Sequence, residues 1–229
     1  MSDMFKGRRS PEKYKDSEPV LLDVPFYRQT QDFTCGPACA MMAMAHYDYN
    51  IELDAELEID VWRESHPGEV YGTIRYGLAH SMWRRGFGVK IFSNTKELEF
   101  LDFIKFRYKD IDLKRLDFFY REMAARCKKA GIPEEFQDLT LEDIDQVLQD
   151  GQVPILLTNA KIFTSEDVPH WIVVAGLDMT RGIITVNNPL GDAQEALTFE
   201  SFQEGMGYRE NQVMLVVLPA QPGRKKGKK

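Results

Sequence analysis

Long apolar runs are missing from this chain of 229 residues, which nowhere has 18 consecutive apolar residues. A helix that crosses a bilayer needs about 20 such residues, so the sequence predicts no transmembrane segment. The first residues, MSDMFKGRRSPEKYKD, are charged and are not followed by the apolar stretch of a secretory signal. We therefore expect a cytoplasmic protein that does not associate with membranes.

Cysteine is also scarce, with only Cys35, Cys39 and Cys127. An odd number of cysteines in a chain long enough to bury its own core argues against a disulfide framework and favours a reducing compartment. Each cysteine is therefore of interest for its reactivity rather than for cross-linking.

Phosphate-binding glycine loops are absent, because neither GxGxxG nor GxxxxGK[ST] occurs, and there is no internal repeat. The formal net charge is −7 even though the last six residues hold five lysines and arginines. The rest of the chain is therefore strongly acidic, which argues against a nucleic-acid partner. We expect no cofactor and no metal site, and the sequence leaves the oligomeric state open.

The composition of the chain, with 43% hydrophobic and 28% charged residues, is typical of one globular domain. We interpret residues 20–219 as that domain and the highly charged residues 94–139 as a helical insertion in it. Residues 1–19 are polar and interrupted by prolines, which predicts a flexible arm. Residues 220–229 are basic and offer no apolar side chain to bury, which predicts a disordered tail.

The pattern of apolar residues favours helices first and strands afterwards. We predict helices from Cys35 with Thr34 as N-cap, at 54–66 and 72–85, at 141–150 behind a capping box of Thr140 and Asp143, and at 199–204. Apolar, β-branched runs predict strands at 87–92, 153–159, 170–178, 182–188 and 213–218. This order, without a repeated βαβ unit, indicates an α+β fold with a C-terminal antiparallel sheet.

Residues that suit nucleophilic chemistry gather around Cys35. A cysteine at a helix N-terminus faces unpaired N–H groups and the positive end of the helix dipole, which predicts a lowered thiol pKa. Gly36 removes side-chain bulk next to the sulfur, and Gln29 offers a side-chain donor for an oxyanion. Cys39, one turn further along, is expected in the core and is the first alternative nucleophile.

A thiolate nucleophile also needs a base, and the chain has four histidines. His170 differs from the others because it opens an apolar strand after Pro169. The next strand ends at Asn187 and Asn188, so a hairpin would bring one of these amides to the imidazole. We expect Asn188, the residue before Pro189, to make that contact.

Three segments, QTQDFTCGPA (29–38), PHWIVVAGL (169–177) and VNNPLGD (186–192), resemble the C39-type cysteine peptidases of the papain-like superfamily. The resemblance implies a papain-like fold and a cysteine peptidase that cleaves a peptide or peptide-like amide bond through an acyl-enzyme. It matches Cys35 to the nucleophile, His170 to the base, Gln29 to the oxyanion-hole donor and Asn188 to the residue that orients the base. That family commonly has Asp at the last of these positions.

Several alternatives remain at this stage. Well-known members of that family are fused to a transporter and cleave double-glycine leader peptides, but this sequence contains no transporter segment, so we do not expect that substrate. We expect residues 94–139 to shape or cover the cleft. The same residues would also suit a thiol acyltransferase or transpeptidase, or a papain-like module that binds peptides without cleaving them. Cys35 alone could be a buried apolar residue. A metal site of Cys35, Cys39 and His46 lacks a second ligand pair at zinc spacing.

Overall fold

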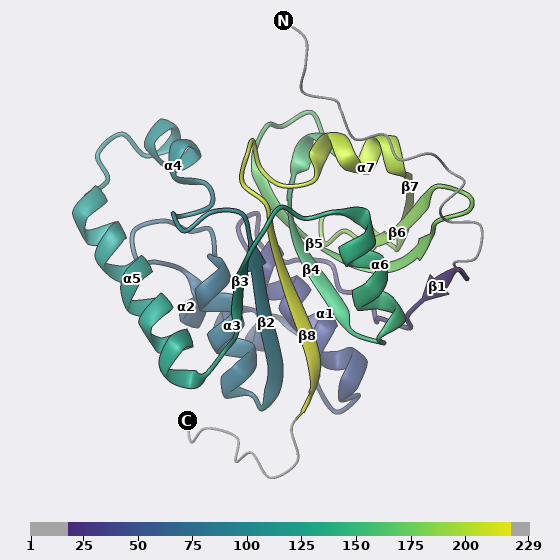
Figure 1. The fold of residues 1–229 in the computed structure, drawn as a ribbon. Helices are drawn as coiled ribbons and strands as arrows, with labels where there is room; N and C mark the ends of the chain where they lie inside the picture. Colours follow the sequence, from purple (N-terminus) through teal and green to yellow (C-terminus); the bar gives the residue numbers. More distant parts are fainter. Residues whose placement is uncertain (1–17, 221–229) are drawn as a thin grey trace, which may run out of the picture.

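The computed structural model describes residues 18–220, which form an α+β structure with helices on both faces of one sheet (Figure 1). Apart from residues 18, 19 and 220, the predicted arm and tail lie outside the described residues. No helix within residues 18–220 has the length and apolar character needed to cross a membrane.

The helices found in residues 18–220 are α1 (Cys35–Tyr47), α2 (Ala55–Ser65), α3 (Arg75–Arg84), α4 (Leu101–Arg107), α5 (Leu113–Ala130), α6 (Leu141–Gln149) and α7 (Phe199–Gly205), with a short 3-10 turn η2 (Ala160–Ile162). Of these, α1, α2, α3, α6 and α7 begin and end close to their predicted bounds, and α4 and α5 lie within residues 94–139, for which no separate helices were predicted. The predicted capping box is present at the start of α6, where the Thr140 and Asp143 side chains each bond the backbone N–H of the other residue.

The strands found in residues 18–220 form one sheet with the order β3-β2-β8-β4-β5-β6-β7, and β1 pairs with one end of β5. They are β1 (Val20–Leu21), β2 (Phe87–Ser93), β3 (Glu134–Phe136), β4 (Val153–Asn159), β5 (Pro169–Asp178), β6 (Ile183–Asn187), β7 (Glu195–Thr198) and β8 (Val213–Ala220).

The prediction of an antiparallel sheet is wrong at one pair of strands, because β2 and β3 run parallel. The chain leaves β2, passes through α4 and α5 and returns to the same edge, and such a crossover joins parallel strands. Residues 94–139 are therefore not wholly helical. They contribute β3, the strand at one edge of the sheet.

Both faces of the sheet are buried, and β5 shows how the sequence achieves this. Trp171 and Val173 belong to one apolar cluster with α1 and α3, whereas Ile172 and Val174 belong to a second cluster with α6 and α7. Successive side chains on a strand point to opposite faces, so a strand buried on both sides needs a continuous apolar run. Figure 1 shows α6 in front of the sheet and α1 to α3 behind it.

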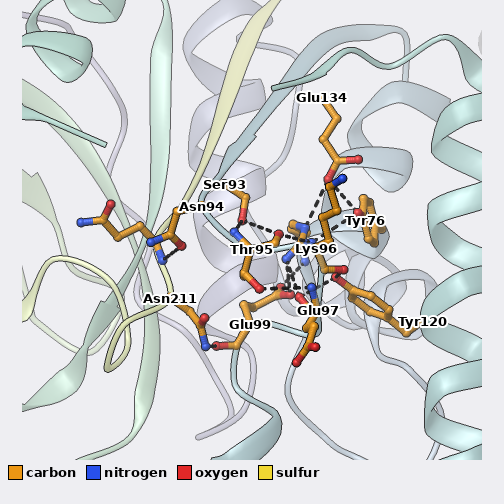
Figure 2. A network of polar contacts seen from close by, with 12 residues as sticks. Tyr76, Ser93, Asn94, Thr95, Lys96, Glu97, Glu99, Tyr120, Glu134 and Asn211 are labelled. Carbon is orange, nitrogen blue, oxygen red and sulfur yellow. Dashed lines mark hydrogen bonds and ion pairs between the residues drawn. The ribbon is translucent and has the colours of Figure 1, made fainter. Parts of the chain in front are cut away.

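A buried ion pair ties residues 94–139 to α3. The side chains of Arg75 and Glu99 have no solvent exposure, and the Arg75 guanidinium lies 2.9 Å from the Glu99 carboxylate. Arg75 also donates to the Thr95 and Glu97 carbonyl oxygens. Tyr120 of α5 donates to the Glu97 carbonyl oxygen (Figure 2). Because a buried charge needs such partners, this network fixes how the segment lies against the domain.

Candidate active site

Cys35 is the first residue of α1, and this helix packs on the central strand β5. The helix can lie close to the sheet because its side chains are small or flexible, and all its residues from Gly36 to Ala45 are buried. At its N-terminus the Cys35 sulfur meets the backbone N–H of Trp171, the second residue after Pro169. The thiol therefore lies beside the start of β5, the strand that carries His170.

His170 and Asn188 are brought together as adjacent ends of β5 and β6. The Nε2 atom of His170 lies 2.9 Å from the side-chain oxygen of Asn188, and both residues are 3% exposed. Asn188 makes this contact, whereas the amide of Asn187 points elsewhere and donates to the Val24 carbonyl oxygen. Because Nε2 is bound to Asn188, the remaining ring nitrogen, Nδ1, is the one free to exchange a proton with a thiol.

Two neighbours contact His170, one at its backbone and one at its ring. The Thr158 hydroxyl on β4 donates to the His170 carbonyl oxygen at 3.1 Å. The Phe163 ring, after η2, stands edge-on to the imidazole with 6.0 Å between centroids. An aromatic ring against the imidazole restricts its rotation and keeps water away from it.

Burial dominates the ionisation of this site. It raises the pKa of the Cys35 thiol to about 11, against the opposing hydrogen bonds from backbone N–H groups of Trp171, Gly36 and Cys35 itself. It also lowers the pKa of His170 to about 4, against the opposing hydrogen bond with Asn188. The expectation of a lowered thiol pKa is therefore wrong, because desolvation of the thiolate outweighs the helix N-terminus.

Gln29 lies in the loop between β1 and α1, and its side chain is already engaged. Its Nε2 donates to the carbonyl oxygen of Gln31 at 2.6 Å, while its Oε1 is buried without a partner. An amide nitrogen carries two hydrogens, so the second N–H remains for another acceptor. The Gln29 backbone N–H donates to the Pro189 carbonyl at 3.0 Å, which ties this loop to the turn after Asn188.

The buried carboxylate of Glu58, which no sequence motif indicated, binds the same loop. Glu58 of α2 has no solvent exposure and accepts from the Thr30 backbone N–H, the Thr30 hydroxyl and the Tyr27 hydroxyl. The Thr34 hydroxyl also contacts this carboxylate. Thr34 is the N-cap residue of α1 by position, but its side chain caps no helix N–H, because it is directed to Glu58 and to the Gln31 carbonyl.

Gly36 faces Thr73 and Leu78, in addition to the sulfur-side space that the sequence predicted for it. A Cβ atom at this position would lie 2.2 Å from the Thr73 hydroxyl oxygen and 2.9 Å from a methyl group of Leu78. A side chain at position 36 would therefore force the Thr73 and Leu78 side chains to move.

Cys39 is fully buried in the core, and burial raises its pKa well above the usual value, as does the neighbouring Cys35. Within residues 18–220, no group of three or more histidine, cysteine, aspartate or glutamate side chains is arranged to hold a metal ion.

A family model described as Peptidase_C39 like family matches residues 24–204. The chain belongs to this family. No curated protein matches the chain. The matched range of this Peptidase_C39 like protein includes Gln29, Cys35, His170 and Asn188, and also residues 94–139. The family resemblance found in the sequence is thereby confirmed.

Proposed function

We propose that this Peptidase_C39 like protein is a cysteine peptidase of papain-like fold, which hydrolyses a peptide or peptide-like amide bond. The observation that carries the proposal is the arrangement at the start of β5. The Cys35 thiol contacts the Trp171 backbone N–H, and the preceding residue, His170, is bound through Nε2 to Asn188. These are a nucleophile, a base and a group that orients the base.

The first chemical step follows from the two shifted pKa values. At neutral pH the resting pair is a thiol and a neutral imidazole, because burial disfavours both charged forms. As the sulfur attacks the substrate carbonyl carbon, its proton passes to Nδ1 of His170. The carbonyl π electrons move to the oxygen, and the resulting imidazolium is stabilised through Nε2–H by the Asn188 oxygen.

Donors at the α1 N-terminus and in the preceding loop stabilise the oxyanion. The backbone N–H of Cys35 faces the reacting sulfur, and Gln29 supplies its second side-chain N–H. Collapse of the tetrahedral intermediate breaks the C–N bond, and the amine leaves with the proton from His170. The product is a thioester between Cys35 and the acyl part of the substrate.

Hydrolysis of this thioester reverses the proton movement. His170 removes a proton from water, the hydroxide attacks the thioester carbonyl carbon, and the sulfur leaves and recovers its proton. The same acyl-enzyme would transfer to an amine in place of water if one is bound nearby. Peptidase and acyltransferase therefore share every residue named here and differ in the second acceptor.

Alkylation with iodoacetamide, mapped by mass spectrometry, tests the proposal. We expect Cys35 to be labelled in the native protein at pH 6–7, and His170→Ala to slow labelling by about 10²-fold because the base is lost. Buried Cys39 and Cys127 serve as internal references. His80→Ala is the matched control, because this half-buried histidine on α3 stacks on Trp83 away from the site.

Turnover is measured with a library of quenched fluorescent peptides. The wild type should release fluorescence, and Cys35→Ala should release none. A protein that binds library peptides without cleaving them, and whose Cys35 labelling does not depend on His170, would be a binding module and would contradict the proposal.

A further inference from the structure

The side chain of Asn188 makes three polar contacts rather than one. Its oxygen accepts from His170 Nε2 at 2.9 Å and from the Leu190 backbone N–H at 3.1 Å. Its amide nitrogen donates to a carboxylate oxygen of Glu195 at 3.0 Å. Glu195 is partly buried at the start of β7, and no sequence motif pointed to it.

These contacts determine which way the Asn188 amide faces. If the amide were turned over, its NH₂ group would oppose the Leu190 N–H, and its oxygen would oppose the Glu195 carboxylate. Both contacts would be repulsive, so Leu190 and Glu195 together hold the oxygen toward His170. An acceptor at Nε2 requires the hydrogen on Nε2. The lone pair then resides on Nδ1, where a base that accepts the Cys35 proton needs it.

The turn between Asn188 and Glu195 is built closely around this carboxylate. The Gly191 N–H donates to the Asn188 carbonyl oxygen at 2.9 Å, and a Cβ atom on Gly191 would lie 2.6 Å from a Glu195 carboxylate oxygen. The other charges at this turn, Arg28 and Asp192, form an ion pair with each other. Glu195 is thus the carboxylate that contacts the hydrogen-bonded chain leading to His170.

We propose that Glu195 is a positioning residue of the active site, which fixes the amide of Asn188 and supplies the negative charge that a neutral asparagine lacks. The hydrogen bonds run from His170 through Asn188 to Glu195, and the Cys35 sulfur lies beside the backbone N–H of Trp171, the residue after His170. This inference rests on the proposed function, because it assigns Glu195 a role in orienting the base of that reaction.

The first test separates orientation from charge. Glu195→Ala removes the partner of the Asn188 amide, so Cys35 labelling and kcat should fall about 10-fold or more. Glu195→Gln keeps an oxygen that accepts from Asn188 but loses the charge. A negative charge favours the protonated form of nearby groups, so its loss should move both limbs of the pH–rate profile to lower pH by a few tenths of a unit.

The second test is non-additivity. In an Asn188→Ala background the contact no longer exists, so Glu195→Ala should have no further effect on kcat. A residue that merely stabilises the turn would lower the melting temperature equally in both backgrounds and leave the pH profile in place. The matched control is Gln194→Ala, which loosens the same turn by removing a bond to Asn187 but does not touch Asn188.

An exchange of the two groups is the third test. Asn188→Asp alone places two carboxylates side by side, which should disturb the site. The Asn188→Asp/Glu195→Gln double variant carries one carboxylate and one amide in reversed order. We expect it to be more active than Asn188→Asp alone, because the glutamine amide donates to the new aspartate.

The outcomes distinguish the two proposals. Absence of His170-dependent labelling in the wild type overturns the proposed function and the role of Glu195 together. Labelling that depends on His170 but not on Glu195, with an unchanged pH profile in Glu195→Gln and no gain in the exchanged double variant, overturns the role of Glu195 alone.

Discussion

The hydroxyl of Thr30 lies 2.6 Å from the carboxylate of Glu58, a side chain on α2 with no exposure to solvent. Glu58 also accepts the Thr30 backbone N–H at 2.9 Å, so one residue of the loop is held by two bonds. Gln29 precedes Thr30, and its backbone N–H is bonded to Pro189. The proposed oxyanion donor is thus fixed from both sides, by α2 and by the turn after β6.

Replacement of Glu58 should therefore affect stability and catalysis together. Glu58→Ala removes the acceptor of the Thr30 backbone N–H, the Thr30 hydroxyl and the Tyr27 hydroxyl, at a cost of about 1–3 kcal/mol in the free energy of unfolding. It should also lower kcat, because Gln29 is no longer held. Urea unfolding and peptide turnover measure the two effects. Glu56→Ala, which changes an exposed residue two positions earlier on α2, should alter neither stability nor kcat.

Gln29→Ala should lower kcat by about 10²–10³-fold, about 3–4 kcal/mol of transition-state stabilisation, with little change in substrate affinity. The expected control is Gln31→Ala, because Gln29 bonds to the backbone carbonyl of Gln31 and not to its side chain. A Gln29→Ala variant that loses affinity while kcat is retained would show that this side chain binds substrate rather than the oxyanion.

The ionisation of His170 predicts a loss of stability in acid. Its pKa falls from 6.5 in the unfolded chain to about 4 on burial, so the unfolded state binds the proton more readily. The contribution of neutral His170 to the free energy of unfolding is fully present above pH 6.5. It is lost as the pH falls through 4, by on the order of 3 kcal/mol in total. Urea unfolding at pH 7 and 4.5 measures it. His170→Gln should show a smaller loss, and an equal loss would contradict the shift.

The same shift predicts the acid limb of the activity profile. His170 must be neutral to accept the thiol proton, so kcat/KM should stay high down to pH values below the ordinary histidine range. An acid limb of the kcat/KM profile near pH 6.5 would mean that the imidazole is well solvated in the working enzyme.

The ion pair of Arg75 and Glu99 should be costly to break. Both side chains are fully buried, and Glu99→Ala leaves Arg75 with the longer contact of 3.6 Å to Glu134 as its carboxylate partner, so it should reduce the free energy of unfolding by about 3–5 kcal/mol. Asp60→Ala breaks a largely exposed pair with Arg63 and should cost less than about 1 kcal/mol. Two equal costs in urea unfolding would mean that the Arg75 charge finds other partners.

Periodicity and capping residues were enough to predict much of the fold. The apolar runs of β4, β5, β6 and β8 and the Thr140–Asp143 capping box are local signals, and the structure contains each element close to its predicted range. β3 and β7 were missed for a physical reason. Each has only three or four residues, and the exposed positions in both give no apolar alternation to recognise. The parallel pairing of β3 depends on the crossover, which no local pattern encodes.

The candidate site was predictable where residues lie in apolar motifs, and not where polar groups meet through space. Cys35, His170 and Asn188 stand at element boundaries that the sequence makes visible. Glu58 had one weak signal, because it lies three residues before the buried Val61 on the inward face of α2. Glu195 had none, since its contact with Asn188 arises from the path of the intervening turn.

The two sides of the site differ in how firmly the backbone holds them. His170 lies on β5, which pairs with β4 over residues 169–173 and with β6 over residues 173–178, whereas Gln29 and the residues after Asn188 lie in loops that are joined to each other. Backbone amides in a central strand exchange with solvent mainly through global unfolding, and loop amides exchange through local opening. In mild denaturant, turnover should thus disappear before the main unfolding transition, with the two loops opening as one unit while the strand that carries the base stays protected.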